Sequence, residues 1–436
     1  MNISKATLAN WANYPVTEAE IATPDNRTEA REYVLGHDRL IARGNGKCYG
    51  DAALSPHVLS TLALSRIIGF DRATGIIECE AGVLLSDILN RSVPEGWFFH
   101  VTPGIKAITV GGAIASDVHG KNHPAKGCFS NWLISFELIR QNGETVICSR
   151  TENPDLFWQT CGGMGWTGVI LSAKFRMMKI ESARMRQSSV RAANLEGLFR
   201  AFDDNRQWSY AAGWLDGTAT GAAAGRGVVF LAEHDTTPGA TSDLSEEWPG
   251  PKAKKPRNVR FFAPSWILNP LSIRIHNEII FSKAKPGEQQ VDLDTYFYPL
   301  DRVQNWNRLY GRRGFIQYQF CLPEENSFDG IRQIMDAIRK SPDTPFLTVM
   351  KRHGDRPAEA VHSFPIRGYS LALDFPRTRS ISRLIPQLDE LVWNAGGKIY
   401  LTKDACSAAR MGRVDPAGFG EEKFYSLLKG RLMEKH

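Results

Sequence analysis

Short apolar and β-branched runs alternate with glycine turns over the first part of the chain. Four runs have the length and composition of β-strands: RIIGF (66–70), GIIECEAG (75–82), TVICS (145–149) and GVILSAKFRM (168–177). Residues 84–90 (LLSDILN) follow a glycine between two of these runs and predict a short helix. Together the pattern predicts a mixed α/β domain over about residues 39–178.

Aromatic strand-like runs alternate with longer helical stretches from about residue 181 to residue 397. Two runs are predicted as strands, TYFYPL (295–300) and GFIQYQF (314–320). Two stretches are predicted as helices, FDGIRQIMDAIRKS (328–341) and SISRLIPQLDELVWNAG (380–396). Strands with helices between them predict an α+β sheet with helices over one face. The tail from Ser407 is predicted to be helical and to return to the first domain.

The segment 251–271 (PKAKKPRNVRFFAPSWILNPL) is basic and proline-punctuated at first, then aromatic and apolar. One interpretation is a surface loop that leads into a core strand. The other is a mobile flap that contacts an anionic membrane or covers a lipid-bearing substrate. The residues alone leave both interpretations open.

The composition is that of a globular protein, with 42% hydrophobic and 10% aromatic residues among 436. We expect no secretory signal and no membrane-spanning helix, because no window approaches about 18 consecutive apolar residues. These features predict a cytoplasmic protein, with peripheral contact at the inner membrane as an option. The formal charge of +6 suits an anionic substrate or a membrane surface, and the basic residues form no long cluster, so no nucleic-acid partner is expected.

Seven cysteines are scattered through the chain. Their number is odd, and they form no CxxC pair and no clustered Cys/His spacing. This argues against a disulfide framework and against structural zinc, so we expect a reducing compartment and no metal.

Three glycine-rich segments carry the candidate chemistry: 42–51 (ARGNGKCYGD), 102–122 (TPGIKAITVGGAIASDVHGKN) and 161–168 (CGGMGWTG). Closely spaced glycines allow backbone N–H groups to converge on an oxyanion or let a planar ring lie against the backbone. The first segment matches neither G-x-G-x-x-G nor G-x-x-x-x-G-K-[ST], so neither the Rossmann nor the Walker interpretation applies. Three such segments in one domain predict a dinucleotide cofactor held in an extended pose.

The order of these segments resembles the FAD-binding domain of the vanillyl-alcohol-oxidase (PCMH-type) flavoprotein superfamily. The resemblance rests on five motifs: VGGAIASDVHGKNH (110–123), DLFWQTCGGMGWTGVI (155–170), YFYPLDRVQNWNRLYGRRGFIQYQF (296–320), SFPIRGYSLALDFP (363–376) and GGKIYLTKD (396–404). It implies an α+β fold: a PCMH-type FAD-binding domain (1–182), an antiparallel-sheet substrate domain with helices on one face (183–397), and a C-terminal segment that returns to the FAD domain (398–436).

The same resemblance implies which residues bind FAD. They are Arg43, Gly44, Asn45, Gly46, Lys47, Cys48, Tyr49, Pro103, Gly104, Thr109, Gly111, Gly112, Ala115, Ser116, Val118, His119, Asn122, Gly168, Ile170 and Tyr400. Many sugar-oxidising relatives carry a histidine in the first loop that bonds covalently to the flavin. Lys47 stands there in this chain, which predicts non-covalent FAD.

Lys403 corresponds to the family's essential lysine, and His119 is the second catalytic candidate. Oxidising a secondary alcohol requires removal of the hydroxyl proton as hydride leaves the carbon. A buried lysine acts there as a base or as a charged stabiliser of an alkoxide. The sequence does not choose between these roles, and His119 has the alternative of a structural imidazole.

Gln317 and Gln319 alternate in one strand and therefore share a face, which either grips sugar hydroxyls or forms the polar outside of a sheet. The resemblance favours the site. The further substrate-binding candidates are Tyr49, Lys121, Trp214, Arg308, Lys351 and Ser370, and their cations suit a substrate phosphate. Two positions depart from the family: Ala372 stands where members sensitive to nitroaromatic inhibitors have cysteine, and Ser370 where asparagine is expected.

The implied activity is FAD-dependent oxidation of a secondary sugar hydroxyl, at C2 of a polyprenyl-phosphoryl pentose, to a keto sugar. A short-chain reductase partner would complete an epimerisation, and oxygen or a quinone would reoxidise the flavin. A soluble aldonolactone or alditol oxidase is the alternative within the class. The alternative of another class is a catalytically silent flavin-binding or lipid-sugar-binding scaffold.

Overall fold

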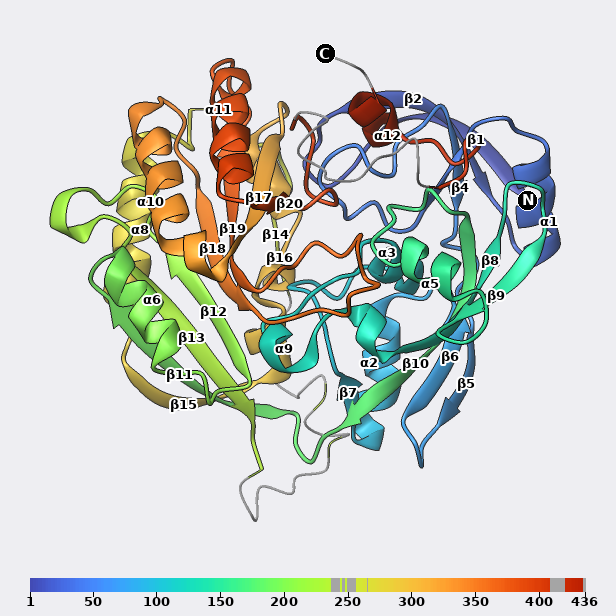
Figure 1. The fold of residues 1–436 in the computed structure, drawn as a ribbon, viewed down its shortest axis with the longest axis horizontal. Helices are drawn as coiled ribbons and strands as arrows, with labels where there is room; N and C mark the ends of the chain where they lie inside the picture. The colour runs from blue at the N-terminus through green and yellow to red at the C-terminus, as the bar shows by residue number, and fades with distance from the viewer. Residues whose placement is uncertain (237–243, 245–247, 249–255, 265, 408–419, 434–436) are drawn as a thin grey trace.

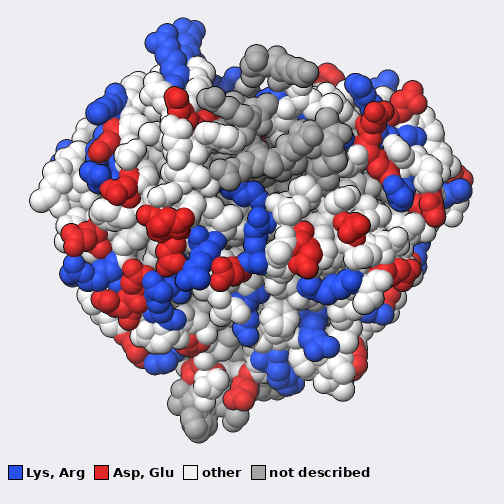
Figure 2. All heavy atoms as spheres, viewed as in Figure 1, with Lys and Arg blue, Asp and Glu red and all other residues white. Residues whose placement is uncertain are grey.

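The computed structural model has two halves, which lie at the left and the right of Figure 1. It describes residues 1–436 apart from 237–243, 245–247, 249–255, 265, 408–419 and 434–436. Two smaller sheets form one half and a large sheet forms the other. Basic and acidic side chains are interspersed over the face shown in Figure 2.

A four-stranded sheet opens the chain, in the order β1-β2-β4-β3. Its strands are β1 (Asn2–Ala9), β2 (Val16–Thr23), β3 (Ile41–Arg43) and β4 (His57–Ser60). Helix α1 (Arg27–Leu35) connects β2 to β3, and it begins where the Asn26 side chain accepts a hydrogen bond from the Glu29 amide. Because β2 and β3 both pair in parallel with β4, the glycine loop after β3 leaves from one end of the sheet.

The second sheet runs β5-β6-β10-β8-β9, with β7 paired to β10. Its strands are β5 (Ile67–Asp71), β6 (Ile76–Glu80), β7 (Trp97–Phe99), β8 (Leu133–Ile139), β9 (Thr145–Ser149) and β10 (Val169–Lys179). The connecting helices are α2 (Leu85–Ser92), α3 (Val110–Ala115), α4 (His123–Lys126) and α5 (Pro154–Thr160), with 3₁₀ turns at Val93–Glu95 and Phe129–Trp132. The strands and the helix expected from the sequence in this region are therefore confirmed.

The large sheet has eight antiparallel strands in the order β15-β11-β13-β12-β18-β19-β17-β20. They are β11 (Arg184–Ala192), β12 (Tyr210–Leu215), β13 (Gly227–His234), β15 (Gly287–Asp292), β17 (Phe315–Pro323), β18 (Leu347–His353), β19 (Gly368–Pro376) and β20 (Lys398–Ile399). The remaining elements of this half are α6 (Leu195–Asp203), α8 (Pro270–Lys283), α9 (Leu293–Phe297), α10 (Glu324–Lys340), α11 (Ile381–Asn394), the two-stranded pair β14 (Arg257–Asn258) and β16 (Val303–Gln304), and 3₁₀ turns at Gly221–Ala223, Pro299–Arg302 and Trp306–Tyr310.

Helices α6, α10 and α11 cover one face of this large sheet, which confirms the α+β expectation. Ile334 of α10 and Leu388 of α11 are fully buried in one core with Tyr318 and Phe320 of β17. Strand periodicity sends the alternate residues of β17 to the opposite face, which faces the other half of the molecule. Because the apolar sides of these helices cover one face of the sheet, only the opposite face is free to form a site.

Two sequence expectations for local structure are wrong. TYFYPL (295–300) is not a strand but the end of α9 and the start of a 3₁₀ turn, because the Asp292 side chain caps the helix through the Thr295 amide at 2.7 Å. The apolar end of 251–271 does not enter a core strand: it leads into α8, and Trp266 and Leu271 stay 73% and 68% exposed. Residues 251–255 and 265 of that segment lie outside the described residues.

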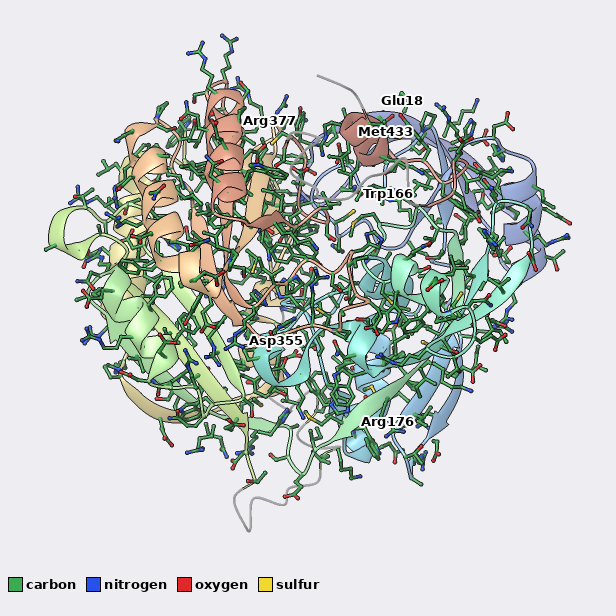
Figure 3. All side chains as sticks on the ribbon, in the orientation of Figure 1. Glu18, Trp166, Arg176, Asp355, Arg377 and Met433 are labelled. Carbon is green, nitrogen blue, oxygen red and sulfur yellow. The ribbon has the colours of Figure 1, made fainter. Side chains whose placement is uncertain are left out.

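The described end of the C-terminal segment packs against the first half of the chain. Leu40 forms a parallel bridge with Phe424, and Trp166 Nε1 donates to Ser426 Oγ at 3.1 Å. Trp166 also shares a hydrophobic core with Leu428 and Leu432 of α12 (Leu427–Met433), and Figure 3 labels Trp166 and Met433. Among the residues described, no helix combines the length and the apolar character needed to cross a membrane.

Candidate active site

A cavity of about 390 Å³ lies between the large sheet and the glycine-rich segments of the first half. One wall comes from residues 42–49, 102–119 and 164–170, and the opposite wall from β17, β18 and β19. Residues 400–403, which follow β20, close the cavity between the two walls. The sheet face left free by α10 and α11 is therefore the face that the cavity uses.

The first wall is built largely of backbone. Gly44 packs so closely on the cap of α3 that a Cβ there would lie 2.1 Å from Thr109 Oγ1. Gly104 is the opposite case, because no atom lies within 4 Å of the position that its Cβ would take. A bare wall of this kind fits a flat ring system and a pyrophosphate, so the residues present fit FAD.

Arg43 holds the first glycine loop in place. Its guanidinium donates to Asn10 Oδ1, to the Ala9 carbonyl oxygen at 2.9 Å and to the Ala53 carbonyl oxygen at 3.2 Å. Lys47, in the same loop, places its Nζ 3.7 Å from the centre of the Trp11 ring. Burial lowers the pKa of Lys47.

Helix α3 carries the second glycine pair into the wall. Thr109 caps it, since Thr109 Oγ1 accepts a hydrogen bond from the Gly112 amide at 3.1 Å. The Gly111 amide donates to the Ala81 carbonyl oxygen at 2.8 Å and so ties α3 to the second sheet. Tyr400 reaches the far end of this helix and donates its hydroxyl to the Ser116 carbonyl oxygen at 2.9 Å.

Amide and hydroxyl side chains line the sheet wall. Gln317 and Gln319 of β17 project into the cavity, with Ser370 and Ala372 of the neighbouring β19 beside them. Ser370 Oγ lies 2.7 Å from His353 Nε2, which fixes the position of its hydroxyl group. This wall therefore offers hydrogen-bonding groups suited to a polyhydroxylated ligand.

His119 sits at the meeting point of the two walls. It is buried, its ring lies 5.6 Å from that of Tyr400, and Gln319 Nε2 donates to His119 Nε2 at 3.2 Å. Burial, assisted by nearby Lys351, holds the pKa of His119 well below its usual value. The imidazole is therefore neutral at physiological pH.

Lys403 lines the cavity, and Asp374, buried behind Gln317, interacts with it electrostatically. The Nζ of Lys403 lies 3.5 Å from the centre of the Tyr49 ring, and Asp374 is buried and accepts a hydrogen bond from Gln317 Nε2. Burial lowers the pKa of Lys403, while the Asp374 carboxylate opposes that change. Burial also raises the pKa of Asp374. A lysine in this setting can reach its neutral form near neutral pH.

Two more lysines line the cavity. The Nζ of Lys121 donates to the Tyr296 carbonyl oxygen and lies 4.0 Å from the centre of the Tyr296 ring. Burial lowers the pKa of Lys121 to about 7 and that of Lys351 to about 8. An anionic group of a ligand would favour the charged form of both side chains.

Most of the predicted site residues line this one cavity, although their roles stay predictions. The lining set is Arg43, Gly44, Asn45, Gly46, Lys47, Cys48, Tyr49, Pro103, Gly104, Thr109, Gly111, Gly112, Ala115, Ser116, Val118, His119, Lys121, Gly168, Ile170, Gln317, Gln319, Lys351, Ser370, Tyr400 and Lys403.

Three predicted residues lie elsewhere. Asn122 donates to the His100 carbonyl oxygen at 2.8 Å, and Arg308 donates to the carbonyl oxygens of Val259 and Arg260 at 3.1 and 2.9 Å. Trp214 is buried in β12 without contributing to the lining, whereas Ala212 of the same strand does. Asn122 and Arg308 thus hydrogen-bond to backbone that does not line the cavity.

Sequence reasoning missed several residues of the site. Asp374 stood inside a quoted motif, but nothing in its local sequence shows that it interacts electrostatically with Lys403. The apolar lining from Phe297, Leu300 and Leu347 was also missed. Phe297 and Leu300 were missed because TYFYPL was predicted to be a strand. Asp292, a residue type that caps helices, was the sequence feature that could have indicated a helix there.

Comparison with known proteins matches residues 27–149 to the FAD binding domain family. The chain is 31% identical over 416 residues to decaprenylphosphoryl-beta-D-ribose oxidase of Mycolicibacterium smegmatis, covering 92% of this chain and 89% of that protein. It is 30% identical over 332 residues to an uncharacterized protein in the mprA 5' region of Streptomyces coelicolor (74% and 89%). L-gulonolactone oxidase of Scyliorhinus torazame is 28% identical over 171 residues (37% and 38%).

The FAD binding domain family and the two oxidases among these relatives agree with a cavity that fits a flavin and a hydroxylated substrate. The match to the oxidase of M. smegmatis spans both halves and therefore both cavity walls. The protein is an FAD-dependent oxidoreductase of the vanillyl-alcohol-oxidase (PCMH-type) family, to which this chain belongs.

Proposed function

We propose that this protein oxidises the C2 hydroxyl of a polyprenyl-phosphoryl pentose to a ketone, as the first half of an epimerisation. The observation that carries the proposal is the position of Lys403, a desolvated amine between a bare backbone wall and a wall of amides. The name of the mycobacterial relative, a decaprenylphosphoryl-ribose oxidase, supports a lipid-linked ribose as the substrate class.

Lys403 is the proton acceptor in this proposal. FAD bound on the glycine wall, held by the loop 43–49 and by residues 103–118, supplies an acceptor for the hydride that leaves the sugar carbon. Lys403, neutral because its pKa is lowered, takes the hydroxyl proton, and the Asp374 carboxylate stabilises the ammonium that results. Gln317 holds Asp374 in place through its hydrogen bond.

His119 and Gln319 orient the sugar. Because the amide nitrogen of Gln319 is engaged by neutral His119, its carbonyl oxygen is the group that faces a sugar hydroxyl. The His119 ring therefore fixes the direction of the amide, and the amide fixes which hydroxyl is presented to Lys403.

The lipid and phosphate parts of the substrate have candidate partners as well. Lys121 and Lys351 suit the phosphate, because a nearby anion restores the charge that burial disfavours. Phe261 and Trp266, 82% and 73% exposed, lie in the described part of 251–271 and suit a prenyl chain or the membrane surface. A short-chain reductase would then reduce the ketone, and oxygen or a quinone would reoxidise the flavin.

We further propose that FAD is held without a covalent bond. The support is Lys47, which occupies the loop position of the linking histidine and rests on Trp11. Acid precipitation of the purified holoenzyme should leave a colourless pellet and a yellow supernatant. A yellow pellet would contradict non-covalent binding.

Anaerobic reduction of the bound flavin tests the substrate assignment. Prenyl-phosphoryl ribose and arabinose are compared with free pentoses, alditols and aldonolactones, and loss of the oxidised-flavin absorption is followed by stopped flow. Rapid bleaching by the prenyl-phosphoryl ribose, with a keto sugar as product, is the expected result. Faster bleaching by the alditols or aldonolactones would replace the proposal with a soluble sugar oxidase, and no bleaching by any compound would favour a silent scaffold.

A further inference from the structure

Glu20, His37 and His57 meet on the four-stranded sheet, and none of them lines the FAD cavity. Glu20 of β2 and His57 of β4 are register partners in a parallel pair, so their side chains leave the sheet side by side. His37 follows the cap of α1, the helix that connects β2 to β3. One ligand atom of each residue lies within 4.8 Å of the other two.

The two contacts of His37 aim one of its ring nitrogens at the Glu20 carboxylate. Its Nδ1 lies 2.9 Å from the Tyr33 carbonyl oxygen, and its Nε2 lies 3.4 Å from Glu20 Oε1. A neutral imidazole has one N–H, so it cannot donate to both oxygens. If Nδ1 donates to the carbonyl, the Nε2 lone pair faces a carboxylate, and a cation between them removes the repulsion.

His57 places a second ring nitrogen near the same Glu20 oxygen. Its Nδ1 lies 3.8 Å from Glu20 Oε1 and is a buried atom without a hydrogen-bond partner among the described residues. The two imidazole rings are 4.7 Å apart. Two ring nitrogens and one carboxylate oxygen thus converge on a small volume.

We propose that Glu20, His37 and His57 bind a divalent transition-metal ion, with Zn²⁺ as the best match. Zinc sites of two histidines and one glutamate are chemically standard, and tetrahedral bonds of about 2.0–2.1 Å put neighbouring ligand atoms about 3.4 Å apart. The separations of 3.4 and 3.8 Å at Glu20 Oε1 require only a small adjustment.

The surroundings of the cluster fit a bound metal. The contact of His37 Nδ1 with a backbone carbonyl is the second interaction that metal-binding histidines usually make, and it sets the tautomer with Nε2 free. The side chains remain between 22% and 41% exposed, so a water molecule can complete the coordination. The ion would join β2, β4 and the end of α1, next to the strand β3 from which the FAD loop leaves.

The test measures zinc bound to the flavin-loaded enzyme. Wild-type protein and the variants His37→Gln, Glu20→Gln and His276→Gln are treated with EDTA, dialysed, exposed to a small excess of ZnCl₂ and desalted, and zinc is quantified against flavin. His276 of α8 is the matched control, because its ring stacks on Phe346 and takes no part in the cluster. Flavin content reports whether each variant is folded.

Wild type and His276→Gln should retain about one zinc per flavin more than His37→Gln and Glu20→Gln. Co²⁺ in place of zinc should give visible d–d absorption in wild type and in the control alone. Equal zinc in all four proteins would overturn the proposal, because the metal would then sit elsewhere. Absence of zinc from wild type would also overturn it.

Discussion

The two walls of the cavity recognise their ligands by different means. The wall from the first half presents backbone, with Gly44 packed on Thr109 and Gly104 facing open space. The wall from the large sheet presents side chains such as Gln317, Gln319 and Ser370. A backbone wall accepts any ligand of the right shape, whereas a wall of directed amides selects particular hydroxyl groups. The difference supports the proposal that one half of the molecule binds the cofactor and the other selects the substrate.

Replacing Lys403 should have the largest effect. Lys403→Ala removes the proposed proton acceptor and leaves every glycine of the first wall in place, so flavin reduction should slow by about 10²–10⁴-fold, while FAD content stays that of wild type. Rapid-mixing kinetics with the best sugar substrate measures the rate, and absorption measures the flavin. Lys351→Met is the paired control, because a phosphate contact should raise KM with little change in kcat. Equal losses of kcat in both variants would mean that Lys403 has no special role.

A side chain at Gly104 should separate cofactor binding from stability. Gly104→Val projects into open cavity, so FAD affinity should fall about tenfold or more, which corresponds to at least about 1.4 kcal/mol, with the Tm of the apoprotein unchanged. Gly69→Val is the matched control: Gly69 also has nothing within 4 Å of its Cβ position, but it lies on exposed strand β5 outside the cavity. Fluorescence titration of the apoprotein with FAD measures both. If the two variants bind FAD equally well, the flavin does not lie against Gly104.

The two walls also differ in how far the sequence reveals them. Small residues at high density encode the backbone wall directly, and the spacing of Gln317 and Gln319 encodes a shared strand face. The roles proposed for Asp374 and for Glu20, His37 and His57 cannot be predicted from a local sequence pattern. They follow only once the chain has folded and has brought distant segments together. Arg308 is predicted in the pocket, but its Nη1 donates to the carbonyl oxygens of Val259 and Arg260, which lie far from it in the sequence.

Removing the charge of Asp374 should shift the pH dependence of flavin reduction. The rate is expected to rise with pH as Lys403 loses its proton, and the Asp374 carboxylate raises the pKa of Lys403. Asp374→Asn should therefore move the acidic limb toward lower pH. It should also lower the plateau by up to about tenfold, because the ammonium product loses its counter-charge. Stopped-flow rates between pH 6 and 9 measure the position of the acidic limb and the height of the plateau. An acidic limb that moves toward higher pH would contradict the interaction between Asp374 and Lys403.

Neighbouring residues of β17 offer the finest test of the two faces. Tyr318 points to the helices and donates to Asp389 Oδ1 at 2.9 Å, so Tyr318→Phe should lower the free energy of unfolding by about 1–3 kcal/mol with kcat/KM unchanged. Gln319 points to the cavity, so Gln319→Leu should lower kcat/KM about fivefold, equivalent to about 1 kcal/mol, with a smaller effect on stability. Urea unfolding measures the free energy of unfolding of both variants, and steady-state kinetics measures their kcat/KM. The outcome that contradicts it is a Tyr318→Phe variant with impaired turnover and normal stability, since the catalytic face of the sheet would then be the one that the helices cover.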